Sequence, residues 1–352
     1  MASRPEHLRV LVVGLGALGG VVAHVLGSTD CRVTALVRRS EIERVVNASG
    51  LRELRSGTLS KPLVTSNAET LTGPFDFVVL ATQPTDIDGA VEAVLGSLNS
   101  SAQVVCLQNG LCEDRVAAKI GAERVIGAVV TFGAKSHGIG VCEHVPGGGL
   151  VLGRIDGSVD ETLTQLAERL KGLGKIRISH NLMGIRWSKL IVNCAISTLG
   201  TIGGDQLGAL LNKPYARELA FEVMGEAVNV ARASSIKLER LPGTLPLQWL
   251  TTSGHEGAGL KSAARSWAQH TAALGLGAKY RRLRSSMLRA IERGHAPAIE
   301  FLNGEIVARG RALGVKTPIN ERARDLVWAI SRGERTPAHE TLRAFYDETR
   351  TP

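Results

Sequence analysis

The fold of this chain is indicated by one stretch near its start, Arg9-Val10-Leu11-Val12-Val13-Gly14-Leu15-Gly16-Ala17-Leu18-Gly19. A short buried strand, a tight glycine turn and a helix follow one another in this way where a dinucleotide binds. Gly14 permits the turn, Gly16 lets the backbone approach a pyrophosphate, and Gly19 lets the helix pack on the strand. We predict that a dinucleotide diphosphate binds at the helix N-terminus through Gly14, Leu15, Gly16, Ala17, Leu18 and Gly19. A glycine-rich turn without a ligand is the alternative.

Short apolar runs alternate with helical stretches through the first half of the chain. The expected strands are residues 9–14, 32–37, 75–81, 103–107 and 124–131. This rhythm predicts a parallel sheet with crossover helices, an α/β arrangement. Two further runs, residues 141–145 and 150–152, are expected to form a hairpin that closes the sheet, with Gly147-Gly148-Gly149 as its turn.

The second half of the chain has a helical pattern. Apolar residues recur at helical spacing through residues 183–199, 216–233, 261–291, 298–313 and 320–330, and residues 244–259 are the expected long loop. A length of 352 residues at roughly 150 per domain suggests two domains, and a 44 % apolar composition is enough for two cores. We expect the first domain at residues 1–176 and the second at residues 177–352.

The net charge of +9 comes from the second half of the chain. Residues 1–176 hold 17 basic and 18 acidic residues, whereas the rest of the chain holds 25 and 15. A basic half favours an anionic partner, which could be nucleic acid, an anionic membrane or an anionic small molecule. Aromatic residues make up 4 % of the chain, which is few for stacking on bases, and the basic run at residues 279–284 is typical of a solvated helix face. We therefore expect a small anionic substrate, and neither nucleic acid nor a membrane.

Cysteine usage and the apolar N-terminal run bear on the compartment. The five cysteines form neither an even set nor a C-x-x-C pair, so we expect no disulfide framework and no metal site. Residues 10–26 resemble the apolar region of a signal peptide, but the run contains His24 and four glycines, and no small-x-small cleavage site follows it. A reducing cytoplasm fits this pattern.

The choice of dinucleotide depends on the residues that follow the second expected strand. An enzyme that uses NAD has Asp or Glu there to accept a hydrogen bond from the ribose 2′-hydroxyl. This chain has Val37-Arg38-Arg39-Ser40. A carboxylate would repel a 2′-phosphate, whereas an arginine binds one, so Arg38 and Arg39 favour NADPH (or NADP⁺). The alternative is that both arginines are solvated loop charges.

A polar stripe interrupts the nearly all-apolar helix expected around residues 187–197. Lys189, Asn193 and Ser197 are spaced i, i+4 and i+8, so they lie on one helix face. A lysine on such a helix often extends to the surface with no further role. Its two polar neighbours, and the need for a proton donor beside a nicotinamide, favour a catalytic role for Lys189.

Motifs along nearly the whole chain together resemble the ketopantoate reductase family, also called 2-dehydropantoate 2-reductase. They are residues 14–20, 107–110 (Leu-Gln-Asn-Gly), 127–134, 187–193 (beginning Trp-Ser-Lys), 285–288 (Ser-Ser-Met-Leu), 302–307 (Leu-Asn-Gly-Glu-Ile-Val) and 317–320 (Thr-Pro-Ile-Asn). The resemblance implies a Rossmann domain that binds NADPH, followed by a helical domain of the 6-phosphogluconate dehydrogenase type that binds the substrate. It also implies an active site in the cleft between the domains, and a homodimer formed by the helical domain is one option.

The resemblance gives roles to single residues. Lys189 would protonate the carbonyl oxygen as hydride arrives at the keto carbon, and Asn193 would orient the substrate. Asn109 would lie between the nicotinamide ribose and the substrate, and Ser286 would hold the substrate carboxylate. The other implied site residues are Ser197 and Ala298 for the substrate and Arg38, Arg39, Gln83, Asn109 and Glu305 for the cofactor. These roles agree with the chemistry, because a developing oxyanion needs a cationic acid and fixed donors near it.

The chain departs from the family pattern where the hydroxyl of ketopantoate is bound. The family carries Gln-Asp after Ser-Met-Leu and Thr-Glu-Ile-Asp about eight residues later, whereas this chain has Arg289-Ala290 and Pro297-Ala298-Ile299-Glu300. Both family carboxylates are therefore replaced, by Ala290 and Ala298. Glu300 is roughly 200° around a helix from Ala298 and is a poor substitute, which leaves His295 and Glu292 as candidates. The family lysine that supports the cofactor phosphate is Gln83 here.

These observations predict an NADPH-dependent oxidoreductase that reduces the ketone of an anionic substrate resembling a 2-keto acid, other than ketopantoate itself. One alternative is a ketopantoate reductase that makes pantoate with substituted site residues. Others are a sensor that binds NADPH without turnover, and a redox-neutral cyclase or isomerase on the same fold. Lys189 and Asn193 argue against the sensor, since a sensor needs no acid beside the nicotinamide.

Overall fold

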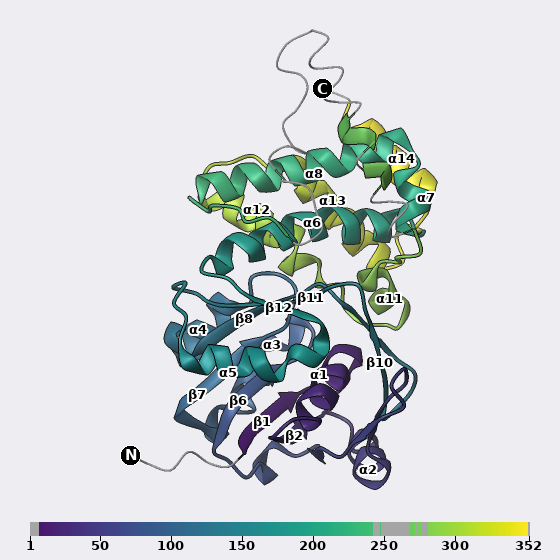
Figure 1. Cartoon of the computed structure of the whole chain (residues 1–352). Coiled ribbons are helices and arrows are strands. Elements are labelled where there is room, and N and C mark those ends of the chain that lie inside the picture. Colours follow the sequence, from purple (N-terminus) through teal and green to yellow (C-terminus); the bar gives the residue numbers. More distant parts are fainter. Residues whose placement is uncertain (1–6, 242–246, 248–267, 272, 276–280, 351–352) are drawn as a thin grey trace. The chain divides into compact units, whose positions relative to one another are not determined.

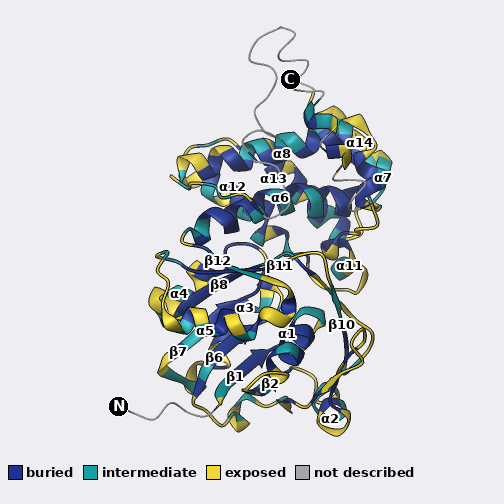
Figure 2. Ribbon diagram, viewed as in Figure 1, coloured by how far each residue is buried: buried dark blue, intermediate teal, exposed yellow. Residues whose placement is uncertain are grey.

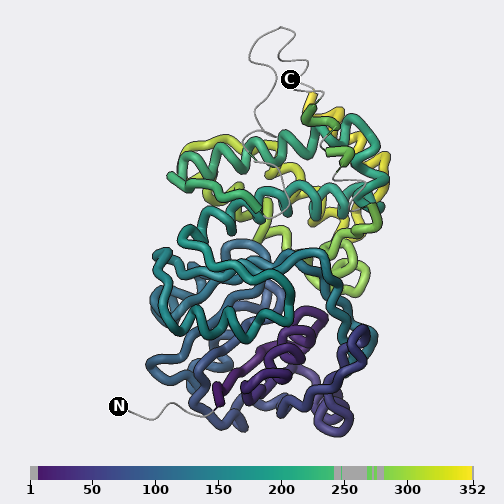
Figure 3. Tube along the Cα trace, viewed as in Figure 1, coloured from purple at the N-terminus to yellow at the C-terminus, as the bar shows by residue number. Residues whose placement is uncertain are grey.

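The computed structural model describes residues 7–241, 247, 268–271, 273–275 and 281–350 (Figure 1). The chain divides into two compact units, Met1–Leu182 and Met183–Pro352, and Figure 3 traces the chain through each of them. The domain boundary expected between residues 176 and 177 falls within strand β12 (Lys175–Ile178) of the first unit.

The first unit is built on an eight-stranded sheet with the strand order β12-β11-β8-β7-β6-β1-β2-β5. Besides β12, its strands are β1 (Leu8–Val13), β2 (Cys31–Leu36), β5 (Leu63–Thr65), β6 (Phe75–Leu80), β7 (Leu98–Cys106), β8 (Val125–Val130) and β11 (Gly149–Arg154). The six strands from β5 to β8 are all parallel, and β11 pairs with β8 in the antiparallel direction. Taken in chain order, the parallel strands lie 3-2-1-4-5-6 across the sheet, which is the order of the Rossmann fold. The predicted parallel sheet is confirmed.

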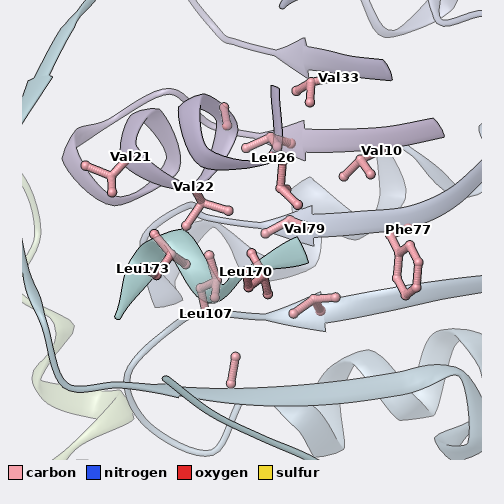
Figure 4. Packing of buried hydrophobic residues seen from close by; sticks show 14 of the residues in the cluster. Val10, Val21, Val22, Leu26, Val33, Phe77, Val79, Leu107, Leu170 and Leu173 are labelled. Carbon is pink, nitrogen blue, oxygen red and sulfur yellow. The ribbon is translucent and has the colours of Figure 1, made fainter. Parts of the chain in front are cut away.

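The helices of the first unit bury this sheet. They are α1 (Ala17–Gly27), α2 (Ser40–Ser49), α3 (Ile87–Glu92), α4 (Glu113–Ile120) and α5 (Glu161–Arg169). Five short 3₁₀ turns lie between them and the strands: Ala68–Thr70, Pro84–Asp86 (η2), Leu95–Ser97, Ala122–Arg124 and Lys171–Leu173. Figure 2 shows the central strands as buried, as expected for a parallel sheet covered on both faces. Val22 and Leu26 of α1 belong to one buried cluster with Val10, Val33 and Val79 of the strands (Figure 4).

The predicted hairpin at residues 141–152 is wrong. Val141–Val145 forms β10 in a separate four-stranded sheet of order β4-β3-β10-β9, with β3 (Leu51–Glu53), β4 (Leu59–Ser60) and β9 (Gly133–Ser136). β10 pairs with β9 in the antiparallel direction and with β3 in parallel, whereas residues 150–152 lie in β11 of the large sheet. The polar sequence of β9, Gly-Ala-Lys-Ser, carries no strand signal, so the true partner of β10 was missed.

Gly147, Gly148 and Gly149 therefore connect two sheets and do not turn a hairpin. A Cβ on Gly148 would lie 2.0 Å from the carbonyl oxygen of Thr131, and one on Gly149 would lie 1.9 Å from that of Lys175. Gly148 and Gly149 are needed because the backbone here passes directly against the residue after β8 and against β12.

The second unit is helical, as predicted. Its described helices are α6 (Leu182–Ile202), α7 (Leu207–Leu211), α8 (Pro214–Ala233), α11 (Ser286–Glu292), the 3₁₀ helix η6 (Ala298–Phe301), α12 (Asn303–Ala312), α13 (Pro318–Ser331) and α14 (His339–Glu348). The helix expected over residues 261–291 is wrong at residues 281–285, which are not helical, and most of residues 261–280 lie outside the described residues. The expected loop at residues 244–259 also lies outside them, apart from Leu247. The backbone of Leu302, with φ −117° and ψ −101°, divides the helix expected at residues 298–313 into η6 and α12.

A buried chain of polar groups ties helices α6, α8, α12 and α13 together. Thr198 Oγ1 donates to Asn303 Oδ1 at 2.6 Å, and Asn303 Nδ2 donates to Asn320 Oδ1 at 2.9 Å and to the Cys194 carbonyl oxygen at 3.3 Å. Asn320 Nδ2 donates in turn to Glu226 Oε2 at 2.7 Å. Buried polar groups that satisfy one another rigidify the core, so this network fixes the position of α6 within the unit.

A buried carboxylate holds the small sheet of the first unit together. Glu53 at the end of β3 is 6 % exposed, and its Oε2 accepts hydrogen bonds from Ser56 N and Ser56 Oγ, both at 2.7 Å. Its Oε1 accepts a bond from His144 N of β10 at 3.0 Å. Burial opposes ionisation of this carboxyl, but the hydrogen bonds outweigh that effect and lower the pKa of Glu53 to about 2.

We predict that Glu53→Gln destabilises the protein at neutral pH. Hydrogen bonds to a charged group are worth about 1.5 to 3 kcal/mol, and the free energy of unfolding should fall by that amount. Because the folded-state pKa of Glu53 is depressed below its ordinary value of 4.5, its ionic contribution is complete above pH 4.5 and is lost as the pH falls towards 2. Urea unfolding curves of both proteins over this pH range measure the difference, with the exposed Glu69→Gln as control. A pH-independent difference would contradict the prediction.

Candidate functional site

The glycine turn after β1 is held by close backbone contacts. Gly14 has a φ of +97°, and its N donates to the Leu36 carbonyl oxygen of β2 at 2.9 Å. A Cβ on Gly19 would lie 1.9 Å from the carbonyl oxygen of Gly14, so no other residue fits there. Gly14 and Gly19 therefore allow α1 to start directly against the end of β1.

Gly16 faces open space instead. It is exposed, and a Cβ built on it would have no described atom within 4 Å. It caps the N-terminus of α1, whose first turn contains no acidic residue. Leu15 and Leu18 pack against the buried cluster, and Ala17 begins the helix. The turn thus presents exposed backbone N–H groups and a helix dipole at a surface from which no Cβ projects, which fits a diphosphate.

Arg38 and Arg39 follow β2 at the same edge of the sheet. Arg39 is exposed and caps the N-terminus of α2 with its backbone. The Arg38 side chain is 81 % exposed, and its Nη2 lies 3.5 Å from Oδ2 of Asp86, the last residue of η2. Gln83 is exposed and caps η2. Sequence reasoning missed Asp86, because no local signal in the sequence indicates that η2 lies beside the end of β2.

Asn109 lies in the loop after β7, next to the loop after β6. Leu107 N donates to the Leu80 carbonyl oxygen at 3.2 Å, and buried Gln108 donates to Thr82 Oγ1 at 3.3 Å. Asn109 itself is exposed. The first unit therefore brings its predicted cofactor residues to one place, the carboxyl ends of β1, β2, β6 and β7, where ligands bind in open α/β sheets.

The second unit carries the predicted polar stripe on α6. Lys189, Asn193 and Ser197 are partly exposed along this helix, whereas its apolar residues are mostly buried. Cys194 is completely buried among the latter, and burial, with a smaller effect of the Glu305 charge, raises the pKa of its thiol. The thiol is therefore unsuited to act as a nucleophile, and the accessible chemistry of α6 lies on the stripe.

Ser286 begins α11 and is exposed. The preceding Ser285, which sequence reasoning missed, is buried, and its Oγ donates to the Ser197 carbonyl oxygen at 2.8 Å and bonds Thr201 Oγ1 at 2.9 Å. Ser285 Oγ also accepts a bond from Leu288 N as the helix cap. The start of α11, with Ser286, is therefore fixed beside the end of the stripe. The signal in the sequence was a serine in the N-cap position.

Ala298 is the first residue of η6 and is partly buried. Glu300 accepts a hydrogen bond from Trp328 Nε1 at 2.6 Å, and Glu292 pairs with Arg284 at 2.5 Å, so both carboxylates have other partners. His295 is exposed after α11.

Glu305 of α12 pairs with Arg309 at 2.6 Å, and the Arg309 guanidinium lies 5.6 Å from the centre of the Trp187 ring. Asn303, two residues before Glu305 on α12, donates to the Cys194 carbonyl oxygen, so this end of α12 lies near the middle of α6.

Among the described residues, no group of three His, Cys, Asp or Glu side chains could hold a metal ion. None of the helices within the described ranges has the length and apolar character needed to span a membrane.

Comparisons with known proteins agree on one family. Residues 10–157 match the family described as "Ketopantoate reductase PanE/ApbA", and residues 181–331 match "Ketopantoate reductase PanE/ApbA C terminal". The chain is 26 % identical over 329 residues to the 2-dehydropantoate 2-reductase of Pyrococcus horikoshii, which covers 93 % of this chain and 97 % of that protein.

Solved structures have the same fold. A PanE/ApbA family ketopantoate reductase from Ralstonia eutropha JMP134 is similar with a TM-score of 0.76 and 27 % identity, over 94 % of this chain and 100 % of that one. A D-mandelate dehydrogenase solved with NADH and anilino(oxo)acetate has a TM-score of 0.75 and 18 % identity, over 93 % and 99 % of the two chains. Because the two family matches together extend over most of the chain, this protein belongs to the ketopantoate reductase family of oxidoreductases.

Proposed function

We propose that this protein is an NADPH-dependent reductase of the ketone in an anionic substrate that resembles a 2-keto acid. The observation that carries the proposal is the partly exposed stripe of Lys189, Asn193 and Ser197 on a helix that is otherwise largely buried. An amino group, an amide and a hydroxyl in one row are the groups that a carbonyl reduction requires for proton transfer and orientation.

The cofactor side of the proposal rests on the first unit. The open backbone at Gly16 and the N-terminus of α1 suit the diphosphate, and Arg38 and Arg39, with Gln83 nearby, suit a 2′-phosphate. Asn109 and Glu305 complete the proposed cofactor set. When bound, NADPH supplies the hydride that reduces the carbonyl carbon.

The protein's own residues handle the proton and the substrate charge. Lys189 donates a proton to the substrate oxygen, and its positive charge stabilises the negative charge that develops there. Asn193 and Ser197, one and two turns further along α6, donate hydrogen bonds that orient the substrate. Ser286, fixed beside Ser197 through Ser285, holds the carboxylate.

One experiment separates the proposal from its three alternatives: NADPH oxidation is followed with a panel of 2-keto acids and bulkier ketones that includes ketopantoate. Reduction of ketopantoate at an ordinary rate favours a pantoate-forming enzyme. If NADPH binds but none of the ketones leads to its oxidation, a sensor or a redox-neutral enzyme is favoured. A homodimer and a cytoplasmic location also stay predictions.

We predict that the protein binds NADPH at least tenfold more tightly than NADH and that Arg38→Ala removes most of this preference. An arginine–phosphate contact is worth about 1.4 kcal/mol or more, which is tenfold in affinity, whereas NADH lacks the phosphate. Calorimetric titrations with both dinucleotides measure the effect. Arg44→Ala, which removes an exposed charge of α2, is the control. Equal affinities of the wild-type protein for the two dinucleotides would contradict the prediction.

We predict that Lys189→Ala lowers kcat by roughly 10² to 10⁴ with the substrate that the panel identifies, the usual scale for loss of a general acid. NADPH binding should be nearly unchanged, since Lys189 acts on the substrate oxygen. Steady-state kinetics test the first point and calorimetry the second. Lys316→Ala, at an exposed lysine of the same unit, controls for loss of charge. Turnover close to that of the wild type would show that another group supplies the proton.

We predict that ketopantoate is a poor substrate and that Ala298→Glu raises its kcat/KM. A carboxylate at position 298 would accept a hydrogen bond from the substrate hydroxyl worth about 1.5 to 3 kcal/mol, or ten- to a few-hundredfold in kcat/KM. The same change should lower kcat/KM for the true substrate. Ala308→Glu on the exposed part of α12 is the control. The prediction fails if the unmodified protein reduces ketopantoate with kcat/KM of about 10⁴ M⁻¹s⁻¹ or more.

A further inference from the structure

Asp86 places a negative charge beside the arginine at the end of β2. It ends η2, and its Oδ2 lies 3.5 Å from Arg38 Nη2. The Asp86 side chain is 34 % exposed, whereas Arg38 is 81 % exposed, so the carboxylate is the more buried of the two. Gly14 N donates to the Leu36 carbonyl oxygen at the end of β2, and Ala81 N, directly after β6, donates to the Val13 carbonyl oxygen at the end of β1. The ends of β1, β2 and β6 therefore meet at this edge, and η2 follows β6 there.

We propose that Asp86 limits the selectivity for NADPH over NADH by opposing the charge of the 2′-phosphate at Arg38. This inference rests on the proposed binding of NADPH. The pair of Arg38 and Asp86 thus sets how strongly the protein prefers NADPH.

The physical reason is the difference in charge between the two dinucleotides. A phosphate monoester carries about −1.5 to −2 near pH 7, whereas the 2′-hydroxyl of NADH is neutral. Arg38 attracts the phosphate, but a carboxylate 3.5 Å from the guanidinium repels the phosphate and partly cancels that attraction. A neutral hydroxyl feels neither effect strongly, so Asp86 penalises NADPH and leaves NADH almost unaffected.

Two other acidic side chains of this region have different partners. Glu43 of α2 accepts bonds from Ser66 N at 2.8 Å and Ser66 Oγ at 2.5 Å. Asp88, two residues after Asp86, lies 3.8 Å from both Arg115 and Lys119. Asp88 therefore offers a matched control, because it is an aspartate of the same segment paired with cations other than Arg38.

The test is Asp86→Asn, with Asp88→Asn as control, and the readout is the Kd of NADPH and of NADH measured by calorimetry without substrate. Asparagine has nearly the same shape as aspartate but no charge. We expect NADPH to bind about three- to tenfold more tightly to Asp86→Asn, with NADH changed by less than about twofold. The gain should shrink in about 1 M salt, where charges are screened within about 3 Å. Asp88→Asn should behave like the wild type.

An unchanged ratio of the two Kd values would overturn the inference while leaving the proposed function intact. Weaker NADH binding with unchanged NADPH binding would also overturn it, because Asp86 would then be an acceptor for the ribose hydroxyl. If the wild-type protein binds no NADPH, the proposed function fails and the inference fails with it. Circular dichroism of Asp86→Asn checks that the variant is folded.

Discussion

The structure of the first unit depends on the contact between α1 and the turn that precedes it. With only a hydrogen atom on Gly19, the helix lies so close to the turn that a Cβ would meet the Gly14 carbonyl oxygen at 1.9 Å. This distance lets α1 begin where β1 ends, so that its N-terminus opens at the carboxyl edge of the sheet. Val21, Val22 and Leu26 then reach the strands, and the loops after β2, β6 and β7 meet around the same edge. One steric constraint thus sets both the packing of α1 and the place at which its N-terminus is exposed.

The second unit exposes a polar row on a helix that is otherwise surrounded by apolar neighbours. A lysine, an amide and a hydroxyl on α6 could rotate or slide with the helix if apolar contacts alone held it, since such contacts have no direction. Hydrogen bonds from Asn303 to the Cys194 carbonyl oxygen and from Thr198 to Asn303 fix its register. Asn303 and Asn320 belong to the two family-like motifs near the C-terminus of the chain, so those motifs have a structural reason that does not require them to touch a ligand.

Features with a local signal could be predicted from the sequence, and features that depend on contacts distant in sequence could not. The parallel strands, the glycine turn and the polar stripe follow from apolar runs, glycine spacing and helical periodicity. The pairing of β10 with β9 could not be predicted, because β9 is polar and short and gains its partner only in the folded sheet. The contact of Asp86 with Arg38 and the bond of Ser285 to the stripe also join residues far apart along the chain.

The positions at which this chain departs from the family pattern are ones that the fold leaves free to vary. Ala290 and Ala298 are partly buried but take no side-chain part in the network of Asn303 and Asn320. Glu300, by contrast, bonds Trp328, and its carboxylate would collide with a Cβ on Gly304 at 2.4 Å, so it is bound into the packing of α12 and α13. A carboxylate can therefore be lost at positions 290 and 298 without loss of the helical framework, whereas moving Glu300 to replace it would break its hydrogen bond with Trp328. In the proposed function, substrate preference can therefore diverge at these two positions while Lys189 and the network that holds α6 stay in place.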